Sequence, residues 1–437
     1  MKGALLAVAI VSAFSIYGPA VHSSGSADGI EGTAYRVATD GSGDFRSIAE
    51  VNAADLAAGD VVRLARGDIF AGVGLRARPG VTYEAYGAGA KPVITRVAGI
   101  AARVRADGVT LRDLKITEVT GPGVRIDDAS GVRIEGLELD RVALDGERAS
   151  LTIFNSRDIT IRDSVFARSE GSNHIWTWNT QGIHIEGNAI TWHGPQDGDG
   201  IQLSRSDDFY IGHNQVTSLG GGKGGIILTP DNTVQPTGGV IEHNDVTGGQ
   251  FGISPRQDNT LVQNNIVRDV GNQAHSQDWA SGIWVSGGFT DADLDVSGLV
   301  IRDNVLDNNR NAFGGWDTHD GLTTEYQVHN NVIRDADDQY FGNGNGIIKG
   351  RFYKNIIVNS AGRRVGAYER SWIEEDNYFY RVDYRRNCGG DPLLDEDFRP
   401  TNGEAAGFGL SDGALVGPQH GVFNGFSVGA AAANGHK

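Results

Sequence analysis

The chain has 437 residues, 39% of them hydrophobic and 21% charged, with 63 Gly and a single Cys. It is too apolar for a disordered protein, and one cysteine excludes an internal disulfide and a cysteine-rich zinc site. The formal net charge of -17 argues against a general nucleic-acid or anionic-membrane binder.

Residues 1–24 have the pattern of a secretory signal peptide. Lys2 precedes an apolar run at 4–17, and mostly small or polar residues follow it. The run is too short to cross a bilayer, and no other segment is long enough. A disordered or helical tail is the alternative. We therefore expect a soluble, secreted or periplasmic protein, a monomer that acts neither on a membrane nor on nucleic acid.

Residues 34–100 are expected to form an N-terminal cap and the first coils. They contain the turn-rich segments Asp40-Gly-Ser-Gly-Asp44, Ala58-Gly-Asp60 and Tyr83-Glu-Ala-Tyr86. These segments resemble the cap that opens many right-handed parallel β-helix proteins, in which a short helix closes the N-terminal end.

Ten later segments share one pattern. An apolar residue is followed, three positions later, by a small or polar residue in most units, and by another apolar residue two positions beyond. Short β-branched runs at this spacing, separated by Gly, Asn and Asp, favour strands over helices. The pattern positions are Leu111/Leu114/Ile116, Ile134/Leu137/Leu139, Ile161/Ser164/Phe166, Ile185/Asn188/Ile190, Ile211/Asn214/Val216, Ile241/Asn244/Val246, Leu261/Asn264/Ile266, Ile301/Asn304/Leu306, Val328/Asn331/Ile333 and Phe352/Asn355/Ile357.

Each unit is interpreted as one coil of a parallel β-helix, with three short strands joined by turns. The asparagine that recurs from Asn188 to Asn355 is predicted to form a stack of hydrogen-bonded amides at one turn, a structural role. Residues 101–390 are the predicted body, and 391–437 the closing segment. The tail that starts at Asp391 resembles the end of such helices in secreted polysaccharide-processing proteins. The predicted fold class is therefore all-β, a right-handed parallel β-helix of the pectate-lyase-like kind.

One strand of each coil tends to start with Gly-Ile after the longest turn, as at Gly200-Ile201. Strand alternation counted from this step predicts which side chains point outward. These are Trp176, Trp178, Gln202, Ser204, Thr229, Ser254, Arg256, Trp284, Ser286 and Trp316.

Outward tryptophans on several coils suit sugar stacking, because a flat aromatic face matches the apolar face of a pyranose ring. We expect Trp176 and Trp178 to form a sugar platform, with Trp284 and Trp316 as further substrate contacts. Packing of the tryptophans under the loops that follow them is the alternative.

Charged residues gather on three adjacent middle coils. Asp199 precedes one outward strand, Lys223 lies among glycines before the next, and Arg256 follows the third. Stacking of the coils should bring the three within side-chain reach. A solvated lysine on a glycine-rich turn is the alternative for Lys223.

Such a set suits β-elimination in a uronic-acid polymer, which needs a neutralised carboxylate, a base for the C5 proton and an acid for the leaving oxygen. A lysine acts as the base where nearby cations favour its neutral form. The Lys on one coil followed by an Arg on the next resembles the alginate lyase and chondroitinase B family of polysaccharide lyases. The resemblance implies Lys223 as base, Arg256 as acid, and calcium near the uronate carboxylate. Asp197 and Asp231 are then the candidate calcium ligands, and Asp199 and Gln202 the adjacent contacts.

Two other functions stay open. The segment Asp197-Gly-Asp199-Gly is similar to a motif of polygalacturonases, so hydrolysis by paired carboxylates is the second hypothesis, with Asp231, Asp317 or Asp320 as partners. A carbohydrate-binding or adhesin-like module is the third, and it needs the tryptophans but not Lys223. His319 and Lys349 are further candidates for contacts with an acidic polysaccharide.

Overall fold

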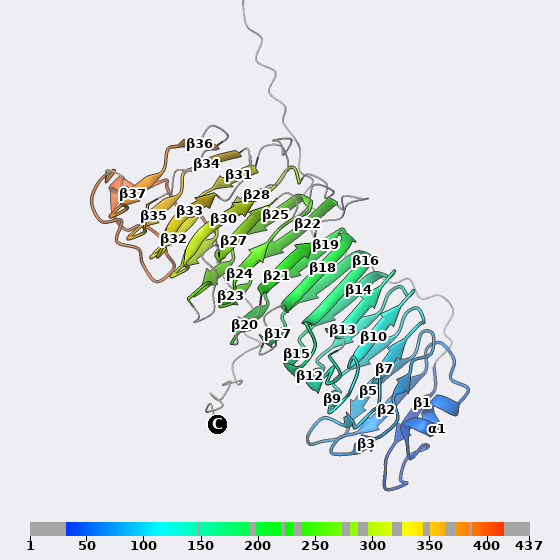
Figure 1. The fold of residues 1–437 in the computed structure, drawn as a ribbon. Coiled ribbons are helices and arrows are strands. Elements are labelled where there is room, and N and C mark those ends of the chain that lie inside the picture. The colour runs from blue at the N-terminus through cyan, green and yellow to red at the C-terminus, as the bar shows by residue number, and fades with distance from the viewer. Residues whose placement is uncertain are drawn as a thin grey trace, which may run out of the picture. The chain divides into compact units, whose positions relative to one another are not determined.

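A computed structural model describes residues 32–146, 149–192, 198–219, 223–229, 237–272, 280–286, 296–316, 326–343, 350–362, 372–383 and 387–414. All of them belong to one compact unit, Gly32–Lys437, and the predicted signal peptide lies outside them. The predicted parallel β-helix is confirmed. Every strand pairing between successive coils is parallel, and each strand pairs with its counterpart one coil on (Figure 1).

Three ladders of strands run along the stack, which we call the site ladder, the second ladder and the third ladder. Within a coil the chain passes from the site ladder to the second, then through a tight turn to the third, and returns to the site ladder by its longest connection.

The site ladder comprises β4 (Leu75–Arg76), β7 (Ala102–Val104), β10 (Val124–Asp127), β13 (Ala149–Phe154), β16 (Asn173–Glu186), β18 (Asp199–Asp207), β21 (Gly224–Thr229), β24 (Phe251–Ser254), β27 (Ser281–Ser286), β30 (Asn311–Trp316) and β33 (Gln339–Asn343). The second ladder comprises β1 (Ala34–Val37), β2 (Val61–Ala65), β5 (Thr82–Tyr86), β8 (Thr110–Arg112), β11 (Arg133–Glu135), β14 (Arg157–Arg162), the far half of β16, β19 (Phe209–Gly212), β22 (Thr237–Glu242), β25 (Asp258–Gln263), β28 (Val300–Arg302), β31 (Tyr326–His329), β34 (Gly350–Tyr353) and β36 (Trp372–Glu375). The third ladder comprises β3 (Ile69–Ala71), β6 (Val93–Thr95), β9 (Lys115–Thr117), β12 (Glu138–Val142), β15 (Val165–Ser169), β17 (Ala189–Trp192), β20 (Gln215–Ser218), β23 (Asp245–Thr247), β26 (Ile266–Arg268), β29 (Val305–Asp307), β32 (Val332–Arg334), β35 (Ile356–Val358) and β37 (Tyr378–Tyr380).

The predicted N-terminal capping helix is present as α1 (Ile48–Ala53), at the blue end of the chain beside β1 (Figure 1). Ser47 caps it, because its hydroxyl accepts a hydrogen bond from the backbone N–H of Glu50 at 3.2 Å. The helix buries Ile48 and Val51 against the core. A short 3-10 turn, η2 (Gly403–Ala405), lies in the closing segment.

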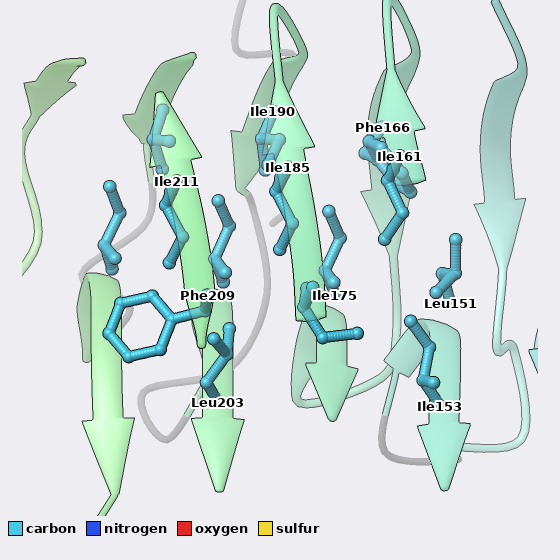
Figure 2. Packing of buried hydrophobic residues seen from close by; sticks show 14 of the residues in the cluster. Leu151, Ile153, Ile161, Phe166, Ile175, Ile185, Ile190, Leu203, Phe209 and Ile211 are labelled. Carbon is cyan, nitrogen blue, oxygen red and sulfur yellow. The ribbon is translucent and has the colours of Figure 1, made fainter. Parts of the chain in front are cut away.

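The core is a continuous column of aliphatic side chains that point inward from all three ladders. Successive rungs repeat the same kind of residue, as in Leu151, Ile175 and Ile201 on the site ladder, each fully buried. Figure 2 shows this packing around Ile185 and Ile211 of the second ladder. The sequence therefore repeats once per coil, because each coil buries side chains at the same matched positions.

The predicted asparagine stack is present and is longer than expected. Asn214 illustrates the unit: its side-chain amide donates to the Asn244 Oδ1 at 2.9 Å and to the Ile185 carbonyl at 3.0 Å. Its neighbour Asn188 donates in turn to the Asn214 Oδ1. The asparagine ladder comprises Asn188, Asn214, Asn244, Asn265, Asn304, Asn331, Asn355 and Asn377.

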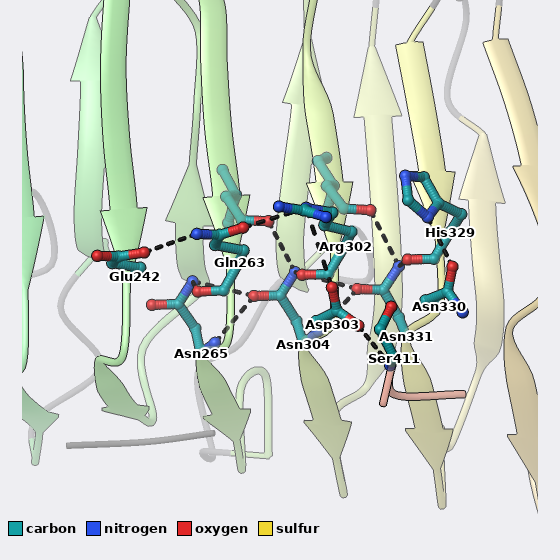
Figure 3. Close-up of polar contacts among 12 residues, drawn as sticks. Glu242, Gln263, Asn265, Arg302, Asp303, Asn304, His329, Asn330, Asn331 and Ser411 are labelled. Carbon is teal, nitrogen blue, oxygen red and sulfur yellow. Dashed lines mark hydrogen bonds and ion pairs between the residues drawn. The ribbon is translucent and has the colours of Figure 1, made fainter. Parts of the chain in front are cut away.

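One unit of the predicted pattern is shifted by one residue. The sequence pattern used Leu261, Asn264 and Ile266, whereas Val262 pairs with Ile241 and the ladder continues through Asn265 (Figure 3). Two adjacent asparagines made both registers fit the pattern. Asn264 instead has a φ of 56°, the left-handed turn conformation that asparagine tolerates.

The closing segment turns back along the third ladder. Leu394, Ala405 and Leu410 pack over outward side chains such as Val332 and Ile356, which are fully buried. This contact forms a second apolar cluster, separate from the central column.

Candidate functional site

A cavity of about 290 Å³ opens on the outer side of the site ladder, over β16, β18, β21 and β24. It is lined by Ser172, Asn173, Asp199, Gln202, Lys223, Ile227, Thr229, Phe251, Ser254 and Arg256. The three predicted catalytic residues, Asp199, Lys223 and Arg256, thus share one cavity with Gln202. The structure brings them together because they come from consecutive coils.

Strand register explains the arrangement. Asn173, Asp199 and Gly224 occupy one row of matched positions across β16, β18 and β21. A parallel row three positions further along the chain contains Gln202, which is matched with Ile227. Strands of adjacent coils lie about 4.8 Å apart, so side chains at matched positions are close neighbours. The Gly-Ile alignment made from the sequence matches the observed register of Ile201 and Ile226.

Asp199 is 6% exposed and leans over the next coil. A Cβ placed on Gly224 would lie 2.9 Å from the Asp199 Oδ1, so the absence of a side chain at Gly224 makes room for the carboxylate. The backbone N–H of Asp199 donates to the Asn173 Oδ1 at 2.9 Å. The carboxylate is therefore held in a small, fixed space at the cavity wall.

A chain of amide hydrogen bonds crosses the cavity. The Asn173 Nδ2 donates to the Gln202 Oε1 at 2.6 Å, and the Gln202 Nε2 donates to the Thr229 hydroxyl at 2.8 Å. These bonds fix the amide of Gln202, so the outward face of the three coils is pre-organised.

The backbone at Lys223 is anchored on both sides. Its N–H donates to the Gly198 carbonyl at 2.8 Å, and its carbonyl accepts from the N–H groups of Gln250 at 3.1 Å and Phe251 at 2.8 Å. The side chain is partly exposed at the cavity wall. Lys223 is thus placed by the coils before and after it.

Arg256 is 4% exposed, and its Nε donates to the Leu228 carbonyl at 3.2 Å. A guanidinium carries a positive charge at neutral pH. The cavity therefore has a buried cation in its wall.

The predicted open tryptophan platform is corrected at two positions. Trp176 and Trp284 do point away from the core, but they are only 7% and 3% exposed. Trp176 packs edge-on against Phe154, with ring centroids 4.9 Å apart, and Trp284 packs against Phe251 at 5.1 Å. A buried ring cannot offer its face to a sugar, so these tryptophans support the site instead.

Trp178 differs from those two tryptophans. It is half-buried, and the Arg205 guanidinium lies 4.8 Å from its ring centroid. Of the three tryptophans, Trp178 is therefore the one that is not buried.

Several predicted residues lie outside the described part of the chain. These are Asp197, Asp231, His319 and Lys349, with Asp317 and Asp320; of Trp316 the strand position is described but not the side chain. In the described ranges, no three His, Cys, Asp or Glu side chains are close enough together to hold a metal ion.

The described lining of the cavity contributes few oxygen ligands for the expected calcium ion. Calcium takes about six to eight oxygen ligands. The described lining supplies one carboxylate, Asp199, and the amide oxygens of Asn173 and Gln202 already accept hydrogen bonds. The two candidate ligands, Asp197 and Asp231, lie outside the described residues, so calcium binding stays a prediction.

Sequence reasoning missed Asn173 and Phe251, and it named Thr229 only as an outward side chain. Asn173 could have been found, because the alignment of Ile175 with Ile201 places it opposite Asp199. Phe251 gave no polar signal, and its place at the cavity became visible only from the packing with Ile227 and Trp284.

Comparison with known proteins agrees with this fold. Residues 98–267 match the family described as "Right handed beta helix region". No curated protein of known function matches the sequence. In the described part of the chain, no helix is both long and apolar enough to span a membrane.

Solved structures share the fold at low sequence identity. The PL6 family alginate lyase AlyGC is 14% identical with a TM-score of 0.62, covering 86% of this chain and 57% of that one. The alginate lyase AlyF-OU02 is 13% identical with a TM-score of 0.54, covering 90% and 95%. The A-module of the Azotobacter vinelandii mannuronan C-5 epimerase AlgE6 is 17% identical with a TM-score of 0.52, covering 74% and 90%. This chain is a right-handed parallel β-helix, similar in structure to polysaccharide-processing enzymes.

Proposed function

We propose that the protein is an exported polysaccharide lyase that cleaves a uronic-acid polymer by β-elimination in the Lys223–Arg256 cavity. The observation that carries the proposal is the lining itself: two cations and one carboxylate from consecutive coils face one outward cavity. The local charge favours an acidic sugar although the chain as a whole is negative, because a ligand responds to the field at the site.

Lys223 is the proposed base. As a neutral amine it takes the C5 proton, and the electron pair of that C–H bond forms the C4–C5 double bond while the bond from C4 to the glycosidic oxygen breaks. Lys223 leaves the step as an ammonium and returns its proton to water.

Arg256 is proposed to meet the negative charge that develops in this step. Its guanidinium has five N–H donors, enough to contact both the uronate carboxylate and the leaving oxygen. The leaving oxygen takes one proton from it, and water restores the guanidinium. Burial strengthens these contacts because few water molecules screen them.

Asp199 and Gln202 are proposed to orient the sugar and the amine of Lys223. Both are fixed by neighbours, Asp199 through Asn173 and Gln202 through Thr229. Ile227 and Phe251 form the apolar part of the same lining. Together they would hold the C5–H bond toward Lys223.

Hydrolysis is the second candidate function, and one observation favours it: Asp199 lies on the motif shared with polygalacturonases. Inverting hydrolysis needs two carboxylates about 6.5–9.5 Å apart. The described lining contains one carboxylate among its ten residues, which favours elimination.

The test is incubation of the purified protein with alginate, pectate, chondroitin and glucuronan, each with and without a chelator. We expect the ultraviolet absorbance of an unsaturated product with at least one polymer, and its loss in Lys223→Ala. Lys115→Ala is the matched control, because Lys115 lies on the third ladder and pairs with Glu138. Reducing ends without absorbance would establish hydrolysis instead, and a chelator-sensitive reaction would show that calcium takes part.

Export is part of the proposal. Expression with the full N-terminus should give a mature protein that lacks about the first 24 residues, the length expected of a signal peptide. N-terminal sequencing of the exported product checks this, and an intact Met1 on exported protein would contradict it.

A further inference from the structure

The first coils carry a second hollow on the same ladder as the cavity. It has a volume of about 730 Å³ and lies over β4, β7 and β10. Three arginines line it, Arg76, Arg103 and Arg125, with Asp145 as the carboxylate among the lining residues.

These arginines occupy matched positions on consecutive coils. Arg76 is paired with Arg103, and Arg103 with Arg125. Their backbones are therefore about 4.8 Å apart from one coil to the next, and three like charges stand side by side. We call this set the arginine row.

On the adjoining second ladder, by contrast, charges of opposite sign stand next to each other. Its outward positions alternate in sign over six consecutive coils, with ion pairs such as Arg63–Glu84 at 3.0 Å and Arg112–Glu135 at 2.8 Å. The alternating residues are Arg63, Glu84, Arg112, Glu135, Arg162 and Glu186. Like charges on adjacent strands destabilise a sheet, so a run of three arginines needs a cause other than folding.

The charges of the arginine row are only partly balanced. Arg125 pairs with Asp127 at 2.9 Å and lies 5.0 Å from the ring centroid of Phe154. Within the described residues, the guanidinium groups of Arg76 and Arg103 make no ion pair or hydrogen bond. Arg76 is exposed and Arg103 is half-buried, so both can reach a ligand in the hollow.

The hollow is rigid where it holds Arg76. The backbone N–H of Arg76 donates to the Asn52 Oδ1 at 2.9 Å, and the Asn52 Nδ2 donates to the Gly74 carbonyl at 2.8 Å. Asn52 belongs to α1, so the capping helix fixes the position of the first arginine.

The line of matched positions that contains the arginine row leads on to the cavity. The next matched positions after Arg125 are Thr152, Trp176 and then Gln202, which lines the cavity. Three rungs separate Arg125 from Gln202, about 14 Å along the stack. The half-buried rings of Phe154 and Trp178 lie beside that path.

We propose that the arginine row is a binding subsite for the anionic groups of a polysaccharide, remote from the cavity and engaged only by chains long enough to span both. The proposal rests on the proposed function for the polymer that also enters the cavity, but binding at the row requires no turnover. A uronate or sulfated chain presents anions in a line, which matches a line of arginines. Single-stranded nucleic acid fits less well, because the lining residues of the hollow contain no aromatic ring for base stacking.

The experiment measures binding by calorimetry to the Lys223→Ala protein, so that no chain is cut. The probes are an alginate trisaccharide, an alginate dodecasaccharide, a neutral mannan dodecasaccharide and single-stranded DNA of matched length. We expect Arg76→Gln with Arg103→Gln to weaken dodecasaccharide binding roughly 10- to 100-fold, with a smaller salt dependence and no change for the trisaccharide.

Two variants guard the result. Arg133→Gln removes one positive charge from an exposed position on the second ladder and should leave binding unchanged. Arg103→Lys keeps the charge and should retain most of the affinity, and thermal melting confirms that each variant folds.

Unchanged dodecasaccharide affinity in the double variant would overturn the proposal, as would an equal loss for the trisaccharide or for Arg133→Gln. Tighter, row-dependent binding of DNA would overturn the choice of a polysaccharide. An arginine-dependent dodecasaccharide affinity in a protein that yields no unsaturated product would leave the row standing and refute the lyase.

Discussion

The asparagine ladder and the lining of the cavity are built on the same coils but follow opposite rules. In the ladder the residue type stays the same from Asn188 to Asn377, and each amide satisfies the next. In the cavity the matched positions change from Asn173 to Asp199 to Gly224 to Phe251. Of these two rows, the constant one stabilises the stack and the changing one lines the cavity.

The largest expected effect on activity comes from a substitution in the cavity. Lys223→Ala should lower the rate of product formation about 10³-fold, or about 4 kcal/mol in activation free energy, because it removes the proposed base. The melting temperature should stay within a degree or two of the wild type. A variant that keeps more than a tenth of the activity would show that another group takes the C5 proton.

A substitution in the asparagine ladder should lower stability and leave substrate binding unchanged. Asn244→Ala removes the acceptor of both the backbone and the side-chain N–H of Asn214 and leaves the Ile211 carbonyl without its donor. We expect a loss of about 3 kcal/mol in unfolding free energy, since buried groups left unsatisfied are costly. Chemical denaturation measures it, with the KM of the remaining folded protein as the readout that should not move.

Two adjacent glycines sharpen the comparison, because one faces the cavity and the other the interior. A Cβ on Gly225 would meet the Gly252 carbonyl oxygen at 2.6 Å and the Val246 Cγ1 at 2.4 Å. Gly225→Ala should therefore cost about 2 kcal/mol of stability.

The atoms nearest to a Cβ on Gly224 all belong to side chains, those of Ile227, at 2.3 Å, and Asp199, at 2.9 Å. Gly224→Ala should displace these two side chains and lower kcat/KM about tenfold at a stability cost below about 1 kcal/mol. Equal effects of the two substitutions on activity and stability would mean that the cavity wall is not functionally distinct.

The smallest expected effect is a pH dependence of stability at His329. Burial lowers the pKa of His329, which stacks on Tyr353 with ring centroids 4.8 Å apart. The unfolded chain then takes up a proton at a pH where the folded protein does not. His329 therefore contributes stability above its unfolded pKa, about 6.5, and this contribution is lost as the pH falls through that value.

The measurement is the melting temperature of the wild type minus that of His329→Gln, between pH 7.5 and pH 5. We expect this difference to decrease as the pH falls. A difference that rises toward low pH would mean that the charged imidazole is favoured in the folded protein.

The sequence was sufficient to predict the fold because the repeat reports burial directly. Leu111 and Ile134, for example, are paired on consecutive coils as the pattern requires. The one error, at Asn264, arose where two asparagines made two registers equally good.

The site was only partly predictable. Asp199, Lys223 and Arg256 could be grouped because stacking brings consecutive coils together. The burial of Trp176 and Trp284 could not be foreseen, because it depends on which neighbouring side chains cover an outward position. The arginine row was missed because its strands β4, β7 and β10 are short and lack the Gly-Ile step that marks the later coils.

The closing segment sets an order for folding during synthesis. Val305, Val332 and Ile356 remain uncovered until residues 394–414 have been made and have folded back over them. The last contacts include the Ser411 N–H to the Asp303 carboxylate at 2.6 Å and the Gly409 N–H to the Lys354 carbonyl at 2.9 Å. A nascent chain that stops before Leu394 therefore exposes an apolar strip along several folded coils. Chaperones and proteases recognise such exposed apolar surface. The closing segment thus removes this recognition signal when it folds back over the strip.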